Sequence, residues 1–128
     1  MDVGNMLIPQ DEFPNILSRH LHGTVPGYGK VLRAKIPRDI VICDWHYFDD
    51  QSVFPTLDVM QKEGFRVLGA TWKKENTTLN FSRYAAKHDA HGMIATTWFH
   101  VVRKEWDVVE YIIKVSGEAF SKDFPDAK

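Results

Sequence analysis

The chain has little cysteine: Cys43 is its one cysteine, so no disulfide can form within the 128 residues. A fold without disulfides depends on a hydrophobic core, and a chain of this length is sufficient for one domain with such a core. We therefore predict a single domain over residues 1–128. Cys43 lies in an apolar run, where a free thiol packs as a small hydrophobe.

An excess of charge of one sign is also missing, as is any long apolar run. Lysine and arginine number 16 against 17 aspartates and glutamates, which argues against nucleic acid as a partner, because phosphate backbones are bound by basic surfaces. No apolar stretch approaches the roughly eighteen residues that cross a bilayer, so we predict no membrane partner. The first residues lack a secretory signal, which predicts a cytoplasmic location if Met1 is the native start.

Several motifs that would identify an enzyme class are absent. No G-x-G-x-x-G or G-x-x-x-x-G-K-[ST] sequence is present to cradle a phosphate, and we predict no cofactor. No G-x-S-x-G sequence is present either, and nothing matches Cys43 with a histidine. Serine and cysteine hydrolase chemistry is therefore not expected.

Three apolar runs, each ending at a tryptophan, recur at intervals of about 26 residues. Near-continuous apolarity over such short lengths is typical of strands that are covered on both faces. We predict a strand in each run. The runs are Asp39–Trp45, Arg66–Trp72 and Gly92–Trp98.

Helix-like segments follow each predicted strand. We expect Ser52 to cap a helix that Gly64 ends, and Asn76 to cap a second one that continues to about His88. A third segment, roughly residues 103–120, has the clearest amphipathic pattern. Strands that alternate with helices at this spacing form parallel βαβ units.

Such units fit either a small open sheet like that of flavodoxin or part of an eight-stranded barrel. Because the glycine-rich turn of the open-sheet nucleotide binders is absent, and because barrels carry function at the carboxyl ends of their strands, we favour the barrel. The predicted fold is α/β, a partial (half) β/α barrel of three to four βα units with parallel strands. A weaker fourth strand is expected at Val3–Ile8, and Pro9–Pro37 is expected to be mostly loop with a helical turn around Asn15–Arg19.

The strand ends carry the residue types that a saccharide site needs, which are flat aromatic surfaces for C–H faces and polar groups for hydroxyls. We predict that Trp45, Trp72 and Trp98 bind substrate, although the same residues could instead fill a barrel end or brace loops. Asp44 either holds a sugar hydroxyl or takes part in acid–base catalysis, or else it points outward as a cap or ion pair. The nearby polar candidates are Asp44, His46, Tyr47, Thr71, Lys73, Thr97 and His100.

Two further groups are weaker candidates. His20 and His22 have an H-x-H spacing that would place both imidazoles on one face of a strand, but nothing fixes a third ligand, so we predict no metal site. The adjacent carboxylates Asp11 and Glu12 could do glycosidic chemistry, but they are equally typical of a helix start or a surface loop.

The order of four sequence blocks resembles the C-terminal half of family 20 glycoside hydrolases, which include β-N-acetylhexosaminidases. The resemblance covers about residues 36–100 and implies an eight-stranded barrel whose sugar pocket is walled by aromatic residues. By position, Trp45, Trp72 and Trp98 correspond to those wall residues. The blocks are Ile36–Tyr47, Phe54–Leu57, Gly64–Trp72 and His91–Trp98.

The chain departs from the family where the catalytic residues belong. The family's catalytic pair is an adjacent Asp-Glu in a [HN]-x-G-x-D-E setting, and Gln10–Glu12 lacks the residues that should precede it. The start, Val3–Leu7, resembles a Trp-Gly-Asp-Met-Leu stretch of related proteins, with Val3 and Asn5 in place of Trp and Asp. We therefore expect a C-terminal half-barrel fragment that is active, if at all, only as part of a complete barrel.

Three functions remain open at this point. The leading one is a glycoside-hydrolase-like fragment that contributes the aromatic wall of a sugar pocket without cleaving a sugar alone. The alternatives are a non-catalytic carbohydrate- or partner-binding α/β module, and a small α/β domain whose tryptophans are all buried. Because a half-barrel leaves strand edges and an apolar face uncovered, we also predict a homodimer.

Overall fold

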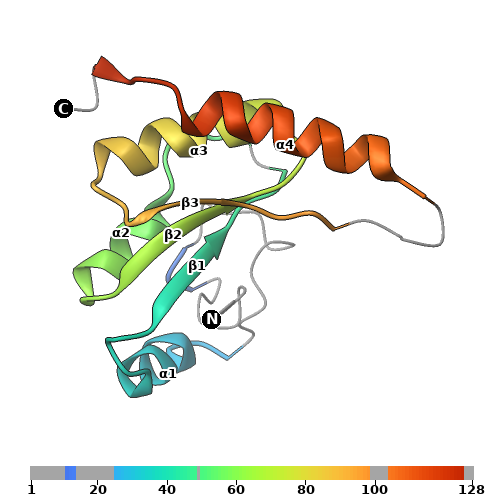
Figure 1. Cartoon of the computed structure of the whole chain (residues 1–128). Helices are drawn as coiled ribbons and strands as arrows, with labels where there is room; N and C mark the ends of the chain where they lie inside the picture. The colour runs from blue at the N-terminus through green and yellow to red at the C-terminus, as the bar shows by residue number, and fades with distance from the viewer. Residues whose placement is uncertain (1–10, 14–24, 49, 99–103, 126–128) are drawn as a thin grey trace.

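The computed structural model of the chain describes residues 11–13, 25–48, 50–98 and 104–125. Within these residues, helices and strands alternate along the chain (Figure 1). None of the described helices is long and apolar enough to span a membrane. The elements are α1 (Tyr28–Lys35), β1 (Val41–Trp45), α2 (Pro55–Lys62), β2 (Arg66–Thr71), α3 (Glu75–Lys87), β3 (Gly92–Ala95) and α4 (Trp106–Phe120).

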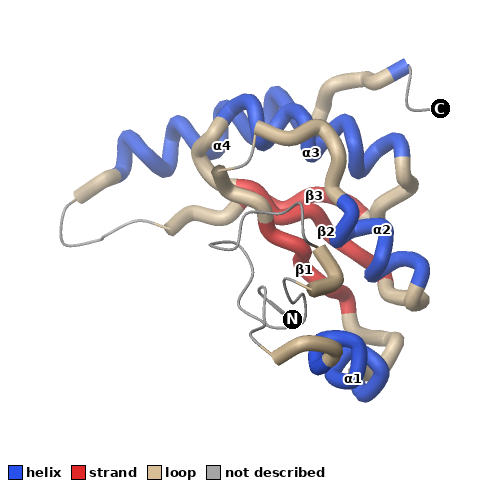
Figure 2. Tube along the Cα trace, turned by 180° about the vertical axis from the view of Figure 1, so that it is seen from behind, coloured by secondary structure: helices blue, strands red, loops and turns tan. Residues whose placement is uncertain are grey.

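The described strands form one open sheet in the order β1-β2-β3, and both neighbouring pairs are parallel. In this register Asp44 lies opposite Gly69, and Gly69 lies opposite Met93. Figures 1 and 2 show α2, α3 and α4 on one side of the sheet, whereas α1 lies below the start of β1. This arrangement confirms the predicted α/β class, a partial β/α barrel with parallel strands joined by helices.

The hydrophobic core lies between the sheet and helices α2 and α3. Ile42 and Val67 point into it from neighbouring strands and are fully buried. Phe54, just before α2, stacks on Phe81 of α3 with ring centroids 4.1 Å apart. Complete burial of side chains of this size contributes about 1.5–3 kcal/mol each, so this layer accounts for much of the stability of the fold.

Gly69 in the middle of β2 permits close contact between the sheet and the core. A Cβ atom at this position would lie 2.6 Å from Met93 Sδ and 3.1 Å from Phe81 Cε1. Met93 of β3 and Phe81 of α3 therefore occupy the space that a side chain would need. A glycine within a strand often marks such a close approach.

Helix α1 corrects the prediction that residues 9–37 are mostly loop. Gly27 precedes it with a φ of 72°, a left-handed conformation that glycine adopts at little cost. Arg33, near the end of α1, is 1% exposed and bonds to Glu63 at the end of α2 and to Glu12. Burial alone would lower the pKa of Arg33, but these hydrogen bonds and charges raise it above its ordinary value.

The two predicted helix caps were each wrong by two residues. Phe54, whose buried ring belongs to the core, is the N-cap of α2 in place of Ser52. Lys74 is the N-cap of α3 in place of Asn76. Neither residue makes a side-chain capping bond. Core packing holds Phe54 at the start of α2, whereas Lys74 bonds to Phe48 O and Asp50 through its ammonium group. The segments predicted at Val3–Ile8 and Asn15–Arg19 lie outside the described residues.

Candidate functional site

The carboxyl ends of the three strands meet at one edge of the sheet, and the alternation of β1 divides the predicted site residues between its two faces. Asp44 and His46 point toward α2 and are each 4% exposed. Trp45 and Tyr47 point to the opposite face, because successive side chains of a strand alternate. The structure therefore separates the acid and the imidazole from the aromatic residues.

Five aromatic side chains gather at this edge, and we call them the aromatic cluster. Tyr47 is at its centre: its ring stacks on Trp45 at 5.0 Å and lies 6.0 Å from the ring of Trp72. The indole Nε1 of Trp98 donates a hydrogen bond to the Tyr47 hydroxyl at 2.9 Å. The cluster consists of Trp45, Tyr47, Phe48, Trp72 and Trp98.

The three tryptophans of the sequence repeat thus converge on one residue from three neighbouring strands. Trp45 ends β1 and Trp72 directly follows β2, whereas Trp98 lies three residues beyond β3, which ends at Ala95 and not at the tryptophan as predicted. Phe48 was not foreseen, but its ring lies 5.7 Å from Trp72 and 6.3 Å from Tyr47 in edge-on contacts. Edge-on and offset ring pairs of this kind are favourable beyond the area that they bury. Its position directly after Tyr47 in the sequence is the feature that could have identified Phe48 as a member of the cluster.

The aromatic cluster is open to solvent on one side. Trp98 is 60% exposed and Phe48 is 45% exposed, whereas Trp45, Tyr47 and Trp72 are half-buried. Phe48 stands edge-on to Tyr47 and Trp72, and Trp98 is held by its hydrogen bond to Tyr47, so the open side of the cluster presents aromatic surface. Such a surface can stack on another flat or C–H-rich face.

Polar atoms accompany these rings. The ammonium group of Lys73 lies 4.1 Å from the centre of the Trp72 ring, a cation–π contact. The Nε1 atom of Trp72 is buried and has no hydrogen-bond partner among the described residues. A buried N–H group in this condition is costly, and an acceptor that reached it would recover part of that cost.

Asp44 and His46 form a buried network with Thr56 of α2. The Thr56 hydroxyl donates to Asp44 Oδ2 at 2.6 Å and lies 2.9 Å from His46 Nε2. Because that hydroxyl donates its hydrogen bond to Asp44, its oxygen accepts from His46 Nε2, and Gln51 Nε2 then donates to His46 Nδ1 at 3.4 Å. The network holds the loop after β1 against the start of α2.

The remaining sequence candidates lie elsewhere or have structural partners. Asp11 accepts a hydrogen bond from the Gly27 N–H group at 2.9 Å, and Glu12 binds the guanidinium group of Arg33. Of the smaller polar candidates, Thr71 is buried and Thr97 is exposed. His20, His22 and His100 lie outside the described residues, and the part that is described contains no group of three acidic, histidine or cysteine residues that could hold a metal ion.

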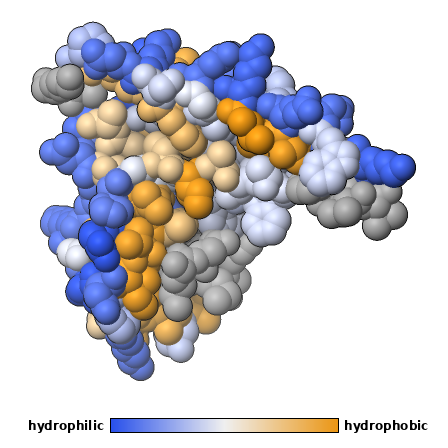
Figure 3. Space-filling view, in the orientation of Figure 1, coloured by the Kyte–Doolittle hydropathy of each residue, from blue (hydrophilic) through white to orange (hydrophobic). Residues whose placement is uncertain are grey.

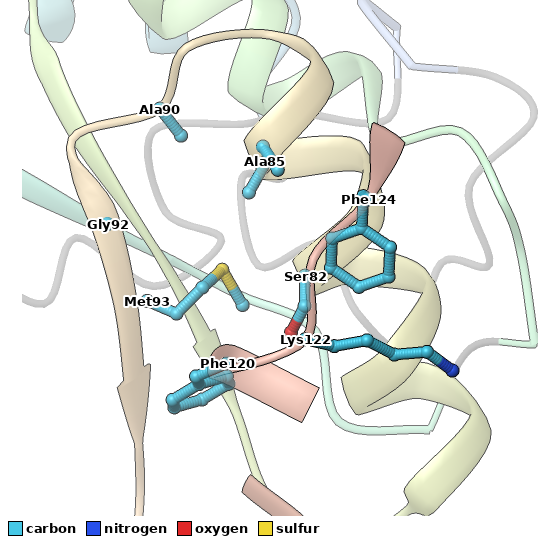
Figure 4. A pocket seen from close by; sticks show the side chains of 9 residues that line it. Ser82, Ala85, Ala90, Gly92, Met93, Phe120, Lys122 and Phe124 are labelled. Carbon is cyan, nitrogen blue, oxygen red and sulfur yellow. The ribbon is translucent and has the colours of Figure 1, made fainter. Parts of the chain in front are cut away.

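A cavity of about 240 Å³ lies away from the aromatic cluster, at the amino end of β3. Ala85 of α3, Met93 of β3 and Phe120 of α4 contribute to its walls. Figure 4 shows the side chain of Lys122 at its edge, running away from Met93. Its walls also include Ser82, whose hydroxyl donates to the backbone oxygen of Thr78 at 2.7 Å.

In comparisons with known proteins, no protein-family model matches the chain, and no curated protein matches it.

Proposed function

We propose that this chain is a glycoside-hydrolase-like half-barrel whose aromatic cluster forms the wall of a saccharide site, and that the chain does not cleave a sugar by itself. One observation carries the proposal. Trp45, Trp72 and Trp98 come from the ends of three neighbouring parallel strands and gather around Tyr47. In β/α barrels this edge of the sheet is where substrates bind.

The chemistry of the cluster suits a sugar ring. The C–H face of a sugar stacks on exposed rings such as Trp98 and Phe48, while its hydroxyls need fixed donors and acceptors nearby. The Tyr47 hydroxyl and the Lys73 ammonium group lie among these rings and supply both kinds of polar contact. Binding through stacking with a few polar contacts is the outcome that we expect.

The buried network supports the second half of the proposal, the lack of independent catalysis. Glycoside hydrolysis uses two carboxyl groups that flank the scissile bond. Asp44 is buried on the other face of the sheet and is bonded to Thr56. Glu12 is bonded to Arg33. In this proposal the catalytic carboxylates would have to come from elsewhere.

A partner-binding module is the second candidate, and the exposure of Trp98 and Phe48 favours it. Exposed aromatic residues are enriched where proteins bind one another. The two candidates differ in the ligand and share the same surface. A titration with small saccharides distinguishes them.

The test follows tryptophan fluorescence and NMR chemical shifts while N-acetylglucosamine, its oligomers and glucose are added. Trp98→Ala is expected to weaken saccharide binding about tenfold, a loss of about 1.4 kcal/mol. Tyr111→Ala is the control, because Tyr111 is also an exposed aromatic residue, at 46%, but lies on α4. The same samples should release no nitrophenol from an aryl N-acetylglucosaminide.

Three results would count against the proposal. Equal loss of binding in Trp98→Ala and Tyr111→Ala would remove the aromatic cluster as the site. A complete lack of response to every saccharide would leave the partner-binding candidate. Turnover of the aryl glycoside by the chain alone would contradict the lack of catalysis.

We further propose that the chain forms a homodimer. In the described sheet β1 and β3 are edge strands, and Ile94 on the face opposite the core is 41% exposed. Figure 3 shows apolar atoms along the strands and again on α4. Uncovered edges and apolar surface of this kind favour association with a second copy.

A further inference from the structure

Helix α4 carries a stripe of solvent-exposed residues. Trp106 is 56% exposed and Ile113 is 62% exposed, and Gly117 follows on the same line of the helix. Eleven residues make three turns with a drift of only about 20°, so Trp106 and Gly117 share one face. The other face of α4, with Ile112 and Val115, is buried toward α3 and β3.

We propose that α4 packs antiparallel against α4 of a second copy, so that Trp106 of each chain covers Gly117 of the other. This inference rests on the self-association proposed above and names its surface. Gly117 leaves a gap in the stripe, because a Cβ atom there would meet nothing within 4 Å. In a two-fold interface a residue and its contact exchange roles, so one stripe supplies both the projecting ring and the gap.

The centre of the stripe fits the same arrangement. If Trp106 faces Gly117 of the other chain, the two-fold axis passes the helix between positions 111 and 112. Ile113, the most exposed of the large apolar residues of α4, then lies close to the same residue of the other chain. The contact therefore covers the two large apolar side chains of the stripe.

Charges beside the stripe favour the antiparallel direction over the parallel one. Glu110 and Lys114 are both exposed and lie next to Ile113 on the helix. In the antiparallel pair Glu110 lies beside the partner's Lys114, and symmetry repeats this contact. A parallel pair would instead place Glu110 beside Glu110 and Trp106 against Trp106, with no gap to receive either ring.

The proposed contact is small. One helix from each chain buries less than the standard area of a stable complex, so we expect a dissociation constant of about 10–100 μM. Sedimentation equilibrium from about 5 to 500 μM covers this range. The unmodified chain should show a reversible monomer–dimer equilibrium.

The first variant fills the gap. Gly117→Gln is expected to weaken the dimer at least tenfold, while the monomer keeps its fold, because glutamine is a better helix former than glycine. Tyr111→Gln is the matched control, since Tyr111 is 46% exposed on α4 but lies about 140° from Trp106 around the helix. Its dissociation constant should change less than twofold. Circular dichroism checks that both variants are folded.

The outcomes separate this surface from the earlier proposals. A chain that stays monomeric at every concentration overturns both self-association and this interface. A dimer that Gly117→Gln leaves intact overturns the interface but keeps self-association. Saccharide titration of Gly117→Gln reports on the aromatic cluster independently of either result.

Cross-linking tests the direction of the helices. Trp106→Cys and Gly117→Cys chains are made separately in a Cys43→Ser background, given different masses, mixed and oxidised. The antiparallel contact predicts that mixed disulfides exceed same-type disulfides at least fivefold. A predominance of disulfides between two Trp106→Cys chains would overturn the antiparallel pairing.

Discussion

The buried hydroxyl of Thr56 is expected to be a main support of the loop after β1, which carries Tyr47 and Phe48 of the aromatic cluster. Thr56 is 1% exposed, donates to Asp44 Oδ2 at 2.6 Å and lies 2.9 Å from His46 Nε2. Thr56→Val replaces this hydroxyl with a methyl group of similar size. Asp44 then loses its hydroxyl donor and His46 loses the matching acceptor.

The expected cost follows from these two bonds. A hydrogen bond to a charged group contributes about 1.5–3 kcal/mol and a neutral one about 1 kcal/mol. His46 Nε2 lies 3.5 Å from Asp44 Oδ1, so a small movement can replace part of the lost bonding. We therefore expect Thr56→Val to lower the free energy of unfolding by about 2–4 kcal/mol, or Tm by roughly 8–16 °C.

Thr56→Ser is the matched control, because it keeps the hydroxyl and removes one methyl group at a cost of about 1 kcal/mol. Urea unfolding followed by circular dichroism gives both values. The serine variant should be the more stable of the two. If the valine variant is as stable as the serine variant, packing of the Thr56 methyl group outweighs the hydrogen bonds and the reasoning is wrong.

Two further changes test the core and the α2–α3 contact. Gly69→Ala places a Cβ atom 2.6 Å from Met93 Sδ, so we expect a loss of about 1–3 kcal/mol in urea unfolding that Met93→Ala partly restores; an unchanged midpoint would contradict the close contact. Burial raises the pKa of Tyr84, and its hydrogen bond to Asp58 raises it further. Because the pKa of Tyr84 is higher in the folded state than in the unfolded state, the stability that this interaction contributes is fully present below about pH 10 and is lost as the pH rises further. The Tm of Tyr84→Phe should therefore fall less at alkaline pH than the Tm of the unmodified chain.

The sequence predicted the sheet well because the strand signal is local. Three short apolar runs ending at tryptophan were sufficient to place β1, β2 and β3 and to infer their parallel direction. Helix α1 was missed because its support is distant in the sequence. Arg33 is held by Glu12 and Glu63, and a buried cation between two remote acids leaves no pattern within the helix itself.

The candidate site was predicted in part. The gathering of Trp45, Trp72 and Trp98 follows from their positions at or shortly after the carboxyl ends of parallel strands. The separation of Asp44 from Trp45 also follows from the sequence, because neighbouring residues of a strand face opposite ways. What could not be foreseen is the role of Thr56, since its contact with Asp44 depends on how α2 packs against β1.

Successive side chains of β1 point to opposite faces of the sheet, so a change on one face can affect the other, and this affects how variants of Asp44 are interpreted. The network of Asp44, His46 and Thr56 fixes the backbone from which Trp45 and Tyr47 project on the other side. An Asp44 variant that loses saccharide binding would therefore fit either a direct contact or a displaced Tyr47. Thr56→Val separates the two explanations, because it leaves the carboxylate in place and removes only its support. If binding falls in Thr56→Val as it does in the Asp44 variant, then Asp44 acts by positioning the aromatic cluster.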